Sequence, residues 1–358
     1  MTPTFTSGKL KGMLEPVEGI ADKAINYLEE KTKASPEIDM KPLIQGFTMD
    51  AICRVAFGMS TNVHKGEDQE FAKTTMEIIQ SFTGDSVINV AFFQFLMMFP
   101  EITAKLGFWP ESATKIRKMA HDIMVERDQK NITTGDFIDR LREYKKIMTP
   151  PITGDMVDAQ SMVFLTAGYE TTANTLGSMM YFFAVNPDLQ DKVYEEIMDT
   201  LGDDENVTHN TIMEMHYLEA FINETLRMKP PLIEHDRLCT RDCVINGIEF
   251  RKGTLVQLSI FAAHYNEEFF PEPNVFNPDR FLKENEDQLI PYTWRPFGAG
   301  NRVCLGQRFA IMEMKIFVAK LLQKFKIVKT SKTALNCPKG TFFLMTYPDI
   351  TVKLEARQ

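Results

Sequence analysis

The sequence contains no apolar run long enough to cross a bilayer. Its most apolar stretch, residues 87–99 (VINVAFFQFLMMF), is interrupted by Asn89 and Gln94. It is also shorter than the about 20 residues that a spanning helix needs. No signal-peptide pattern is present. A segment of this kind usually belongs to a protein core, so membrane contact at 87–99 requires a further reason.

A disulfide framework is absent as well. The five cysteines are odd in number and irregular in spacing: Cys53, Cys239, Cys243, Cys304 and Cys337. Cys239 and Cys243 lack the second pair of ligands that a structural zinc site needs. This usage is typical of a protein from a reducing compartment.

The chain also lacks an excess of positive charge and a linker. It has 40 Lys and Arg against 49 Asp and Glu, a formal net charge of −9. A nucleic-acid partner is therefore not expected, because such proteins present a basic surface to phosphate. No repeat or Pro/Gly/Ser-rich stretch divides the 358 residues, of which 44% are apolar. Composition alone allows one large domain or two ordinary ones.

Helical periodicity dominates the first part of the chain. Residues 10–147 read as helices, with breaks at Ser35-Pro36, Pro100 and Pro110. Helices are predicted over residues 67–82 and 111–128, on either side of the apolar stretch. A long central helix opens at Thr153 and runs past Tyr181, with Asn186 and Pro187 starting the next helix, and another helix covers residues 217–229.

Extended structure is expected after residue 240. Residues 243–250 predict a hairpin around the turn Asn246-Gly247, residues 253–262 alternate as a strand, and residues 341–354 predict a closing hairpin. The predicted fold class is mainly α with small β-sheets (α+β), mainly helical over 1–240 and mixed over 241–358.

The most informative segment surrounds Cys304. Glycines precede it by six and four residues and follow it by two, and Arg302 lies two residues before it. Glycine permits a tight loop and close approach to a ligand, and the arginine suits a flat anionic group such as haem. The apolar pattern after Cys304 predicts a helix, whose N-terminus would lower the thiol pKa and favour a thiolate ligand. An isolated cysteine is more often a buried free thiol, but this spacing argues against that.

The pattern Phe297-x-x-Gly300-x-Arg302-x-Cys304-x-Gly306 resembles that of the cytochrome P450 haem-thiolate monooxygenases. Three further motifs follow the order of that family: Ala167-Gly168-Tyr169-Glu170-Thr171-Thr172, Glu224-Thr225-Leu226-Arg227 and Phe276-Asn277-Pro278-Asp279-Arg280-Phe281. The resemblance runs from about Thr2 to the C-terminus. The string from Thr2 to Lys9 and the motif at 167–172 look most like the microsomal animal branch that oxidises steroids and xenobiotics.

The resemblance implies a single P450 domain over 1–358 that binds haem b, with Cys304 as the axial iron ligand. It implies oxygen insertion from O₂ into a hydrophobic steroid, fatty acid or xenobiotic. Electrons would come from NADPH-cytochrome P450 reductase at the cytosolic face of the endoplasmic reticulum membrane. In the family, the position of residues 87–99 is a lid that dips into the membrane, so peripheral membrane contact is expected there.

The resemblance also assigns residues to the haem. Arg302 and Arg237 would pair with propionates, and Phe297 would pack on the ligand side of the ring. The full set of expected haem contacts is Cys304, Arg302, Arg237, Phe297, Gly298, Gly300, Gly306 and Ala167. Substrate contacts are expected from Ala167, Thr171, Leu232, Ile233, Phe342 and Phe343, each of which could equally be core. The 22 Met and 27 Phe fit an adaptable apolar cavity or a large core.

Glu170 and Thr171 are the predicted catalytic pair. Gly168 weakens the helix nearby and a threonine hydroxyl can bond back to a carbonyl, which favours a local kink or water-filled groove. By resemblance, the pair with water would relay protons to bound dioxygen. The alternative is a plain surface Glu beside a Thr run.

Glu224 and Arg227 share a helix face because they are three residues apart. Spacing alone suggests only a solvated pair, whereas the resemblance adds Arg280 and makes a buried structural triad behind the Cys304 loop.

The resemblance begins partway into a family helix. We therefore expect a chain that lacks the family's N-terminal anchor, first strands and first helices. Two interpretations stay open, namely a working monooxygenase and a truncated non-catalytic remnant that binds haem weakly or not at all.

Overall fold

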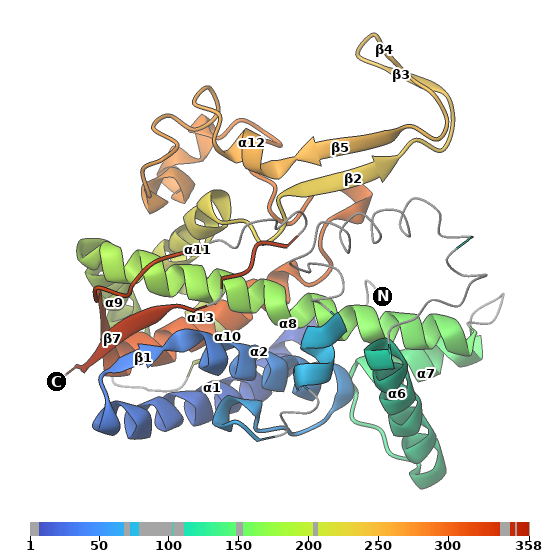
Figure 1. Ribbon diagram of the computed structural model, residues 1–358, viewed down its shortest axis with the longest axis horizontal. Helices are drawn as coiled ribbons and strands as arrows, with labels where there is room; N and C mark the ends of the chain where they lie inside the picture. Colours follow the sequence, from blue (N-terminus) through green and yellow to red (C-terminus); the bar gives the residue numbers. More distant parts are fainter. Residues whose placement is uncertain are drawn as a thin grey trace.

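The computed structural model describes residues 7–67, 72–78, 102, 111–147, 153–202, 207–336, 344–347 and 349–357. They form a mainly helical fold with small antiparallel sheets (Figure 1), which confirms the predicted fold class. The helices are α1 (Ser7–Ala34), α2 (Met40–Phe57), α6 (Glu111–Lys130), α7 (Phe137–Ile147), α8 (Gly154–Val185), α9 (Pro187–Leu201), α10 (His209–Glu214), α11 (His216–Met228), α12 (Ile260–His264) and α13 (Gln307–Lys324). Short 3-10 helices cover Val63–Lys65, Pro278–Phe281, Lys283–Gln288 and Gly300–Arg302.

The strands are β1 (Glu37–Asp39), β2 (Glu234–Leu238), β3 (Cys243–Ile245), β4 (Ile248–Phe250), β5 (Leu255–Ser259), β6 (Phe325–Val328) and β7 (Thr351–Ala356). Of the helix predicted over 67–82, residues 72–78 are helical and Glu67 is not, while 68–71 and 79–82 lie outside the described residues. The apolar stretch 87–99 lies outside the described residues, as do Phe342, Phe343 and Cys337.

Helix α8 runs across the middle of the molecule, with α1 and α2 on one side and the β2–β5 sheet on the other (Figure 1). Its start is fixed by Thr153, whose side chain accepts a hydrogen bond from the N–H of Met156. The helix continues unbroken through Gly168. A Cβ atom at Gly168 would lie 2.6 Å from Cδ1 of Ile52 on α2. The glycine therefore allows α2 and α8 to pack closely, which is a different role from the predicted kink.

The predicted junction between α8 and α9 is confirmed in position. Pro187 is the first residue of α9, and Asn186 precedes it. The Asn186 side chain does not cap α9, because it donates instead to the carbonyl of Phe182 at the end of α8.

The sheets correct three sequence predictions. First, β1 is a strand within a region predicted as helical, and β7 lies between β1 and β6 in a three-stranded sheet. Second, the described part of residues 341–354 does not fold back on itself, since Leu344 bridges Leu232 and β7 pairs with β1 and β6. Third, the strand predicted over 253–262 ends at Ser259, whose hydroxyl accepts from the N–H of Ala262 and starts α12.

The β3–β4 hairpin follows the prediction. Asn246 and Gly247 form its two-residue turn with φ angles of 52° and 82°, the left-handed values that such a turn requires. The hairpin projects from the body of the molecule beyond the β2–β5 sheet (Figure 1).

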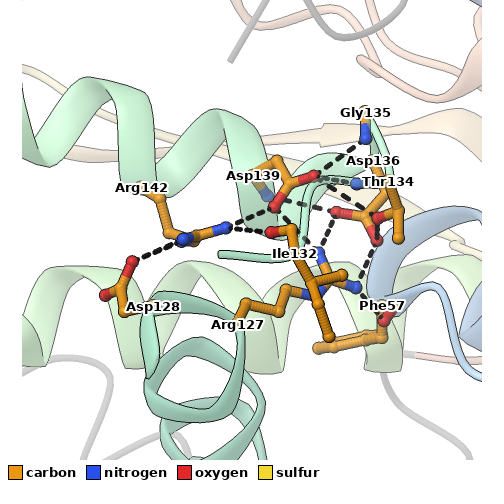
Figure 2. Close-up of polar contacts among 9 residues, drawn as sticks. All are labelled: Phe57, Arg127, Asp128, Ile132, Thr134, Gly135, Asp136, Asp139 and Arg142. Atoms are coloured by element: carbon orange, nitrogen blue, oxygen red, sulfur yellow. Dashed lines mark hydrogen bonds and ion pairs between the residues drawn. The ribbon is translucent and has the colours of Figure 1, made fainter. Parts of the chain in front are cut away.

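A buried polar cluster joins α6 and α7 to the end of α2 (Figure 2). The guanidinium of Arg127 donates to both carboxylate oxygens of Asp136 at 2.7 and 2.6 Å, to Asp139 at 3.1 Å and to the carbonyl of Phe57 at 2.6 Å. Gly58 ends α2 with a φ of 64°. A Cβ at Gly58 would lie 2.7 Å from both Arg127 and Asp136, so the cluster fits only against glycine.

Candidate functional site: the cysteine loop

A closed loop holds Cys304. Its N–H donates to the carbonyl of Phe297 at 2.7 Å. Between these residues Gly298 and Gly300 have φ angles of 77° and 71°, which other residues adopt only with strain. Gly306 then caps α13, which begins three residues after the cysteine. The loop therefore ends with the thiol at a helix N-terminus, as predicted.

The Cys304 sulfur accepts hydrogen bonds from the backbone N–H groups of Gly306 and Gln307. The residue as a whole is exposed while its sulfur is largely covered, and this burial raises the thiol pKa. The net direction is opposite to the one predicted from the helix N-terminus, because burial outweighs the two N–H contacts. A metal ion that binds such a sulfur removes its proton whatever the pKa of the free thiol.

One histidine and two arginines lie beside the cysteine loop. His235 and Arg237 lie on the same side of β2 because they are two residues apart. Nε2 of His235 is 3.3 Å from the carbonyl of Arg295, and a Cβ on Gly298 would lie 3.5 Å from the same nitrogen. Burial and the charges of Arg237 and Arg295 lower the His235 pKa, so its ring stays neutral. The site thus carries positive charge from arginines.

Arg237 and Arg302, the two arginines predicted to pair with haem propionates, differ in their exposure. Arg237 is half-buried and donates to the carbonyl of Asp236, while Arg302 is exposed in the loop. Among the described residues neither forms an ion pair with a carboxylate. Nε of Arg295 is buried and has no hydrogen-bond partner. Two arginines with uncompensated charge and one unsatisfied buried N–H are available to an anionic group.

Aromatic residues connect the cysteine loop to helix α11. Phe297 is half-buried and meets the ring of Trp294 edge to face, with centroids 6.3 Å apart. The indole N–H of Trp294 donates to the carbonyl of Asn223 on α11 at 3.1 Å. The loop is therefore fixed to the helix that carries Glu224 and Arg227.

The three predicted structural residues meet in the interior. Arg227 donates to both carboxylate oxygens of Glu224 at 2.7 and 2.8 Å, and both side chains are fully buried. Nε of Arg280 is 3.6 Å from the same carboxylate, an ion-pair distance that is long for a hydrogen bond. The backbone N–H of Asn277 adds a bond of 2.8 Å. Burial raises the pKa of Glu224 although both arginines oppose the shift.

His264 links this triad to the cysteine loop, which the sequence did not reveal. Its Nδ1 lies 3.0 Å from the carbonyl of Arg227, and its Nε2 accepts from the N–H of Arg295 at 3.2 Å. A carbonyl can only accept and an amide N–H can only donate, so the contacts fix a neutral ring protonated at Nδ1. Burial lowers the His264 pKa to about 4.

The predicted catalytic pair points in two directions from α8. The hydroxyl of Thr171 donates to the carbonyl of Ala167 at 2.7 Å. Ala167 is exposed and Thr171 half-buried, on the same helix face as the half-exposed Val163. Glu170 is buried and accepts from Gln45 at 2.9 Å, with Lys41 at 3.3 Å. The structure therefore gives Thr171 an accessible position and fixes Glu170 between α8 and α2.

Of the remaining substrate candidates, Leu232 and Ile233 are described and are half-buried. Ile233 packs against the larger apolar core, and Leu232 packs against a second core around α2, α6 and α7. Their role in binding stays a prediction.

These residues fit a haem. The loop offers the sulfur of Cys304, whose hydrogen-bond donors are backbone N–H groups. The unsatisfied Nε of Arg295 and the unpaired charge of Arg237 suit carboxylates. Sequence reasoning missed His235 and Arg295, although the two-residue spacing of His235 from Arg237 on a strand was a usable signal.

Comparison with known proteins agrees with this site. The family model for cytochrome P450 matches residues 1–354. The chain therefore belongs to the cytochrome P450 family of monooxygenases. It is similar to cytochrome P450 3A6 of Oryctolagus cuniculus, with 33% identity over 348 residues that cover 95% of this chain and 69% of the relative.

Two further relatives are of the same kind. Cytochrome P450 3A2 of Rattus norvegicus is 32% identical over 364 residues, 97% of this chain and 72% of its own. Cytochrome P450 3A11 of Mus musculus is 33% identical over 343 residues, 94% and 68% of the two chains. Within the described residues, no helix has the length and apolarity to cross a membrane.

Proposed function

We propose that the protein is a haem-thiolate monooxygenase that inserts one oxygen atom from O₂ into a hydrophobic small molecule of the steroid, fatty acid or xenobiotic class. The observation that carries the proposal is the loop closed by the Cys304 N–H and the Phe297 carbonyl, with two backbone N–H groups directed at the sulfur. The similarity to 3A relatives supports this substrate class.

Bound haem b would supply the activation of dioxygen, which no amino-acid side chain performs. Cys304 would be its axial ligand. The N–H groups of Gly306 and Gln307 would stabilise negative charge on the sulfur. Arg237, Arg295 and Arg302 would receive the propionates, beside the neutral ring of His235.

Thr171 is the residue we assign to proton transfer at the open face of α8. Its hydroxyl already donates to the Ala167 carbonyl, so it can accept a hydrogen bond from a water molecule and pass its own proton on by rotation. Glu170 would deliver a proton to this face only through water, because its two oxygens are bound by Gln45 and Lys41.

Electrons would come from NADPH-cytochrome P450 reductase, and the protein would act at the cytosolic face of the endoplasmic reticulum membrane. Both assignments rest on the family. Cell fractionation and turnover with added reductase test them directly.

The absorption spectrum of the reduced, CO-bound protein tests the cysteine assignment. Thiolate ligation shifts the Soret band to the red, and we expect this band in the wild-type chain after haem reconstitution. Cys304→Ser should lose the band while Cys243→Ser, a half-buried thiol elsewhere, should keep it. A red-shifted band in Cys304→Ser would assign the iron to another cysteine, and haem-free wild-type protein would support a remnant without activity.

A further inference from the structure

Two cysteines lie together where β2 ends and β3 begins. The sulfur atoms of Cys239 and Cys243 are 3.8 Å apart. Both residues are half-buried, so small reagents can reach them. Cys53 is buried and Cys304 belongs to the loop described above. Among the cysteines that the structure describes, this is the pair whose sulfurs are in contact.

The backbone holds both cysteines against one segment. The N–H of Cys239 donates to the Thr254 carbonyl at 2.9 Å, and its carbonyl accepts from Gly253 at 2.7 Å. Cys243 is paired with Phe250 in the β3–β4 hairpin. Residues 250–254 thus hold the backbone of both cysteines, and a disulfide requires the sulfurs to approach from 3.8 Å to about 2 Å.

The surroundings of Cys243 favour its protonated thiol. Burial raises the pKa of Cys243, and the neighbouring Cys239 sulfur raises it further, whereas the charge of Arg241 acts in the opposite direction. The sulfur of Cys239 also lies 3.0 Å from the carbonyl oxygen of Arg241. Both sulfurs therefore face the same three-residue turn.

We propose that Cys239 and Cys243 form a redox-active dithiol, a modification site for low-molecular-weight disulfides of the glutathione class. The thiolate of one cysteine attacks a sulfur of the small disulfide, forms a mixed disulfide and releases one small thiolate. The second cysteine gives its proton to solvent, attacks the protein sulfur of the mixed disulfide and expels the second small thiolate. The protein loses two electrons and two protons, and the small disulfide becomes two thiols.

The proposed disulfide between Cys239 and Cys243 would join the end of β2 to the start of β3. His235 and Arg237 stand on β2, beside the Cys304 loop. The modification therefore acts on the strand that supplies the cationic edge of the haem site.

Peptide mapping tests the proposal on the haem-reconstituted full chain. The protein is incubated with glutathione disulfide, quenched with acid, alkylated and digested with trypsin. Trypsin cleaves after Arg237, Arg241 and Arg251, which places the two cysteines on separate peptides, 238–241 and 242–251. We expect these two peptides to appear as one disulfide-joined species that separates on reduction.

The single variants provide matched controls. Cys239→Ser and Cys243→Ser should each stop at a mixed disulfide that carries one glutathione on the remaining cysteine. Cys53 and Cys304 lie on other tryptic peptides, so modification of these two cysteines is measured separately. Glutathione on either sulfur of the wild type without the joined species would overturn the proposal. So would a native protein that stays unmodified while the unfolded chain reacts.

Discussion

The Nζ atom of Lys41 on α2 lies 3.3 Å from Oε1 of Glu170 on α8. Gln45, one turn further along α2, donates to the other carboxylate oxygen at 2.9 Å. Glu170 is buried, so its charge is balanced by this contact and not by solvent. The acid of the predicted catalytic pair is therefore a bridge between two helices.

We expect Glu170→Ala to lower the free energy of unfolding by about 3 kcal/mol, because the ammonium of Lys41 keeps the Tyr347 carbonyl but loses its counter-charge. The control is Glu143→Ala, which removes a 2.6 Å pair with Arg140 in which the Glu143 side chain is 58% exposed. That change should cost less than about 0.5 kcal/mol. Urea unfolding measures both, and equal costs would show that Glu170 contributes no more than a surface pair.

Thr171→Ala should raise the peroxide released per molecule of product by roughly tenfold with little change in haem content, because proton delivery becomes mistimed. Thr171→Ser keeps the hydroxyl and should restore coupling. Thr175→Ala is the matched control, since Thr175 makes the same back-bond to the Thr171 carbonyl at 3.0 Å. Product and peroxide are measured together, and unchanged coupling in Thr171→Ala would remove this residue from the relay.

Arg227→Lys should cost about 3 kcal/mol, because lysine cannot reproduce the two-pronged bond to a fully buried Glu224. Arg280→Lys should cost about 1 kcal/mol, since that pair is longer and the Arg280 side chain is 12% exposed. Chemical unfolding compares the two. A larger loss for Arg280→Lys would contradict this order.

Gly58→Ala should cost about 3 kcal/mol, from left-handed backbone strain together with the contact to Arg127 and Asp136. Gly135→Ala separates these causes. Gly135 has a similar φ of 74°, yet nothing lies within 4 Å of its Cβ position. Its replacement should cost about 1 kcal/mol. Similar losses at both positions would show that strain alone accounts for Gly58.

Stability should fall in mild acid because of His264. Its folded pKa is about 4, below the unfolded value near 6.5. As the pH drops below about 6.5 the unfolded chain binds a proton that the folded chain does not, so the folded state loses stability. Between pH 7.5 and 5.5 the loss from this residue is about 1.3 kcal/mol. Comparing wild type with His264→Gln isolates it, and identical pH slopes would refute the assignment.

Local signals predicted the parts of the fold that local chemistry decides. Thr153 was readable as the start of α8 because a hydroxyl before an apolar helix satisfies a free N–H. Asn246-Gly247 predicted a hairpin turn because both residues readily adopt the left-handed backbone conformation that such a turn needs. Ser259 could have predicted the end of β5, because serine commonly caps a helix. The alternating pattern of residues 253–262 favoured a longer strand instead.

Contacts between distant segments could not be predicted. The strand β1 has only three residues, Glu37–Asp39, and pairs with β7 far along the chain. Lys41 and Glu170 are 129 positions apart, so spacing could not show that they meet. The buried state of Glu224 and Arg227 likewise followed from the family resemblance, because their spacing alone fits a solvated pair equally well.

The position of β7 between β1 and β6 affects how the chain is made. β1 leaves the ribosome about 300 residues before the strand that pairs with it. Until then β1 presents free N–H and C=O groups, and α2 keeps surface that β7 later covers. The sheet therefore closes late, after most helices have emerged. A nascent chain stalled before residue 351 should bind holdase chaperones more strongly than the released protein.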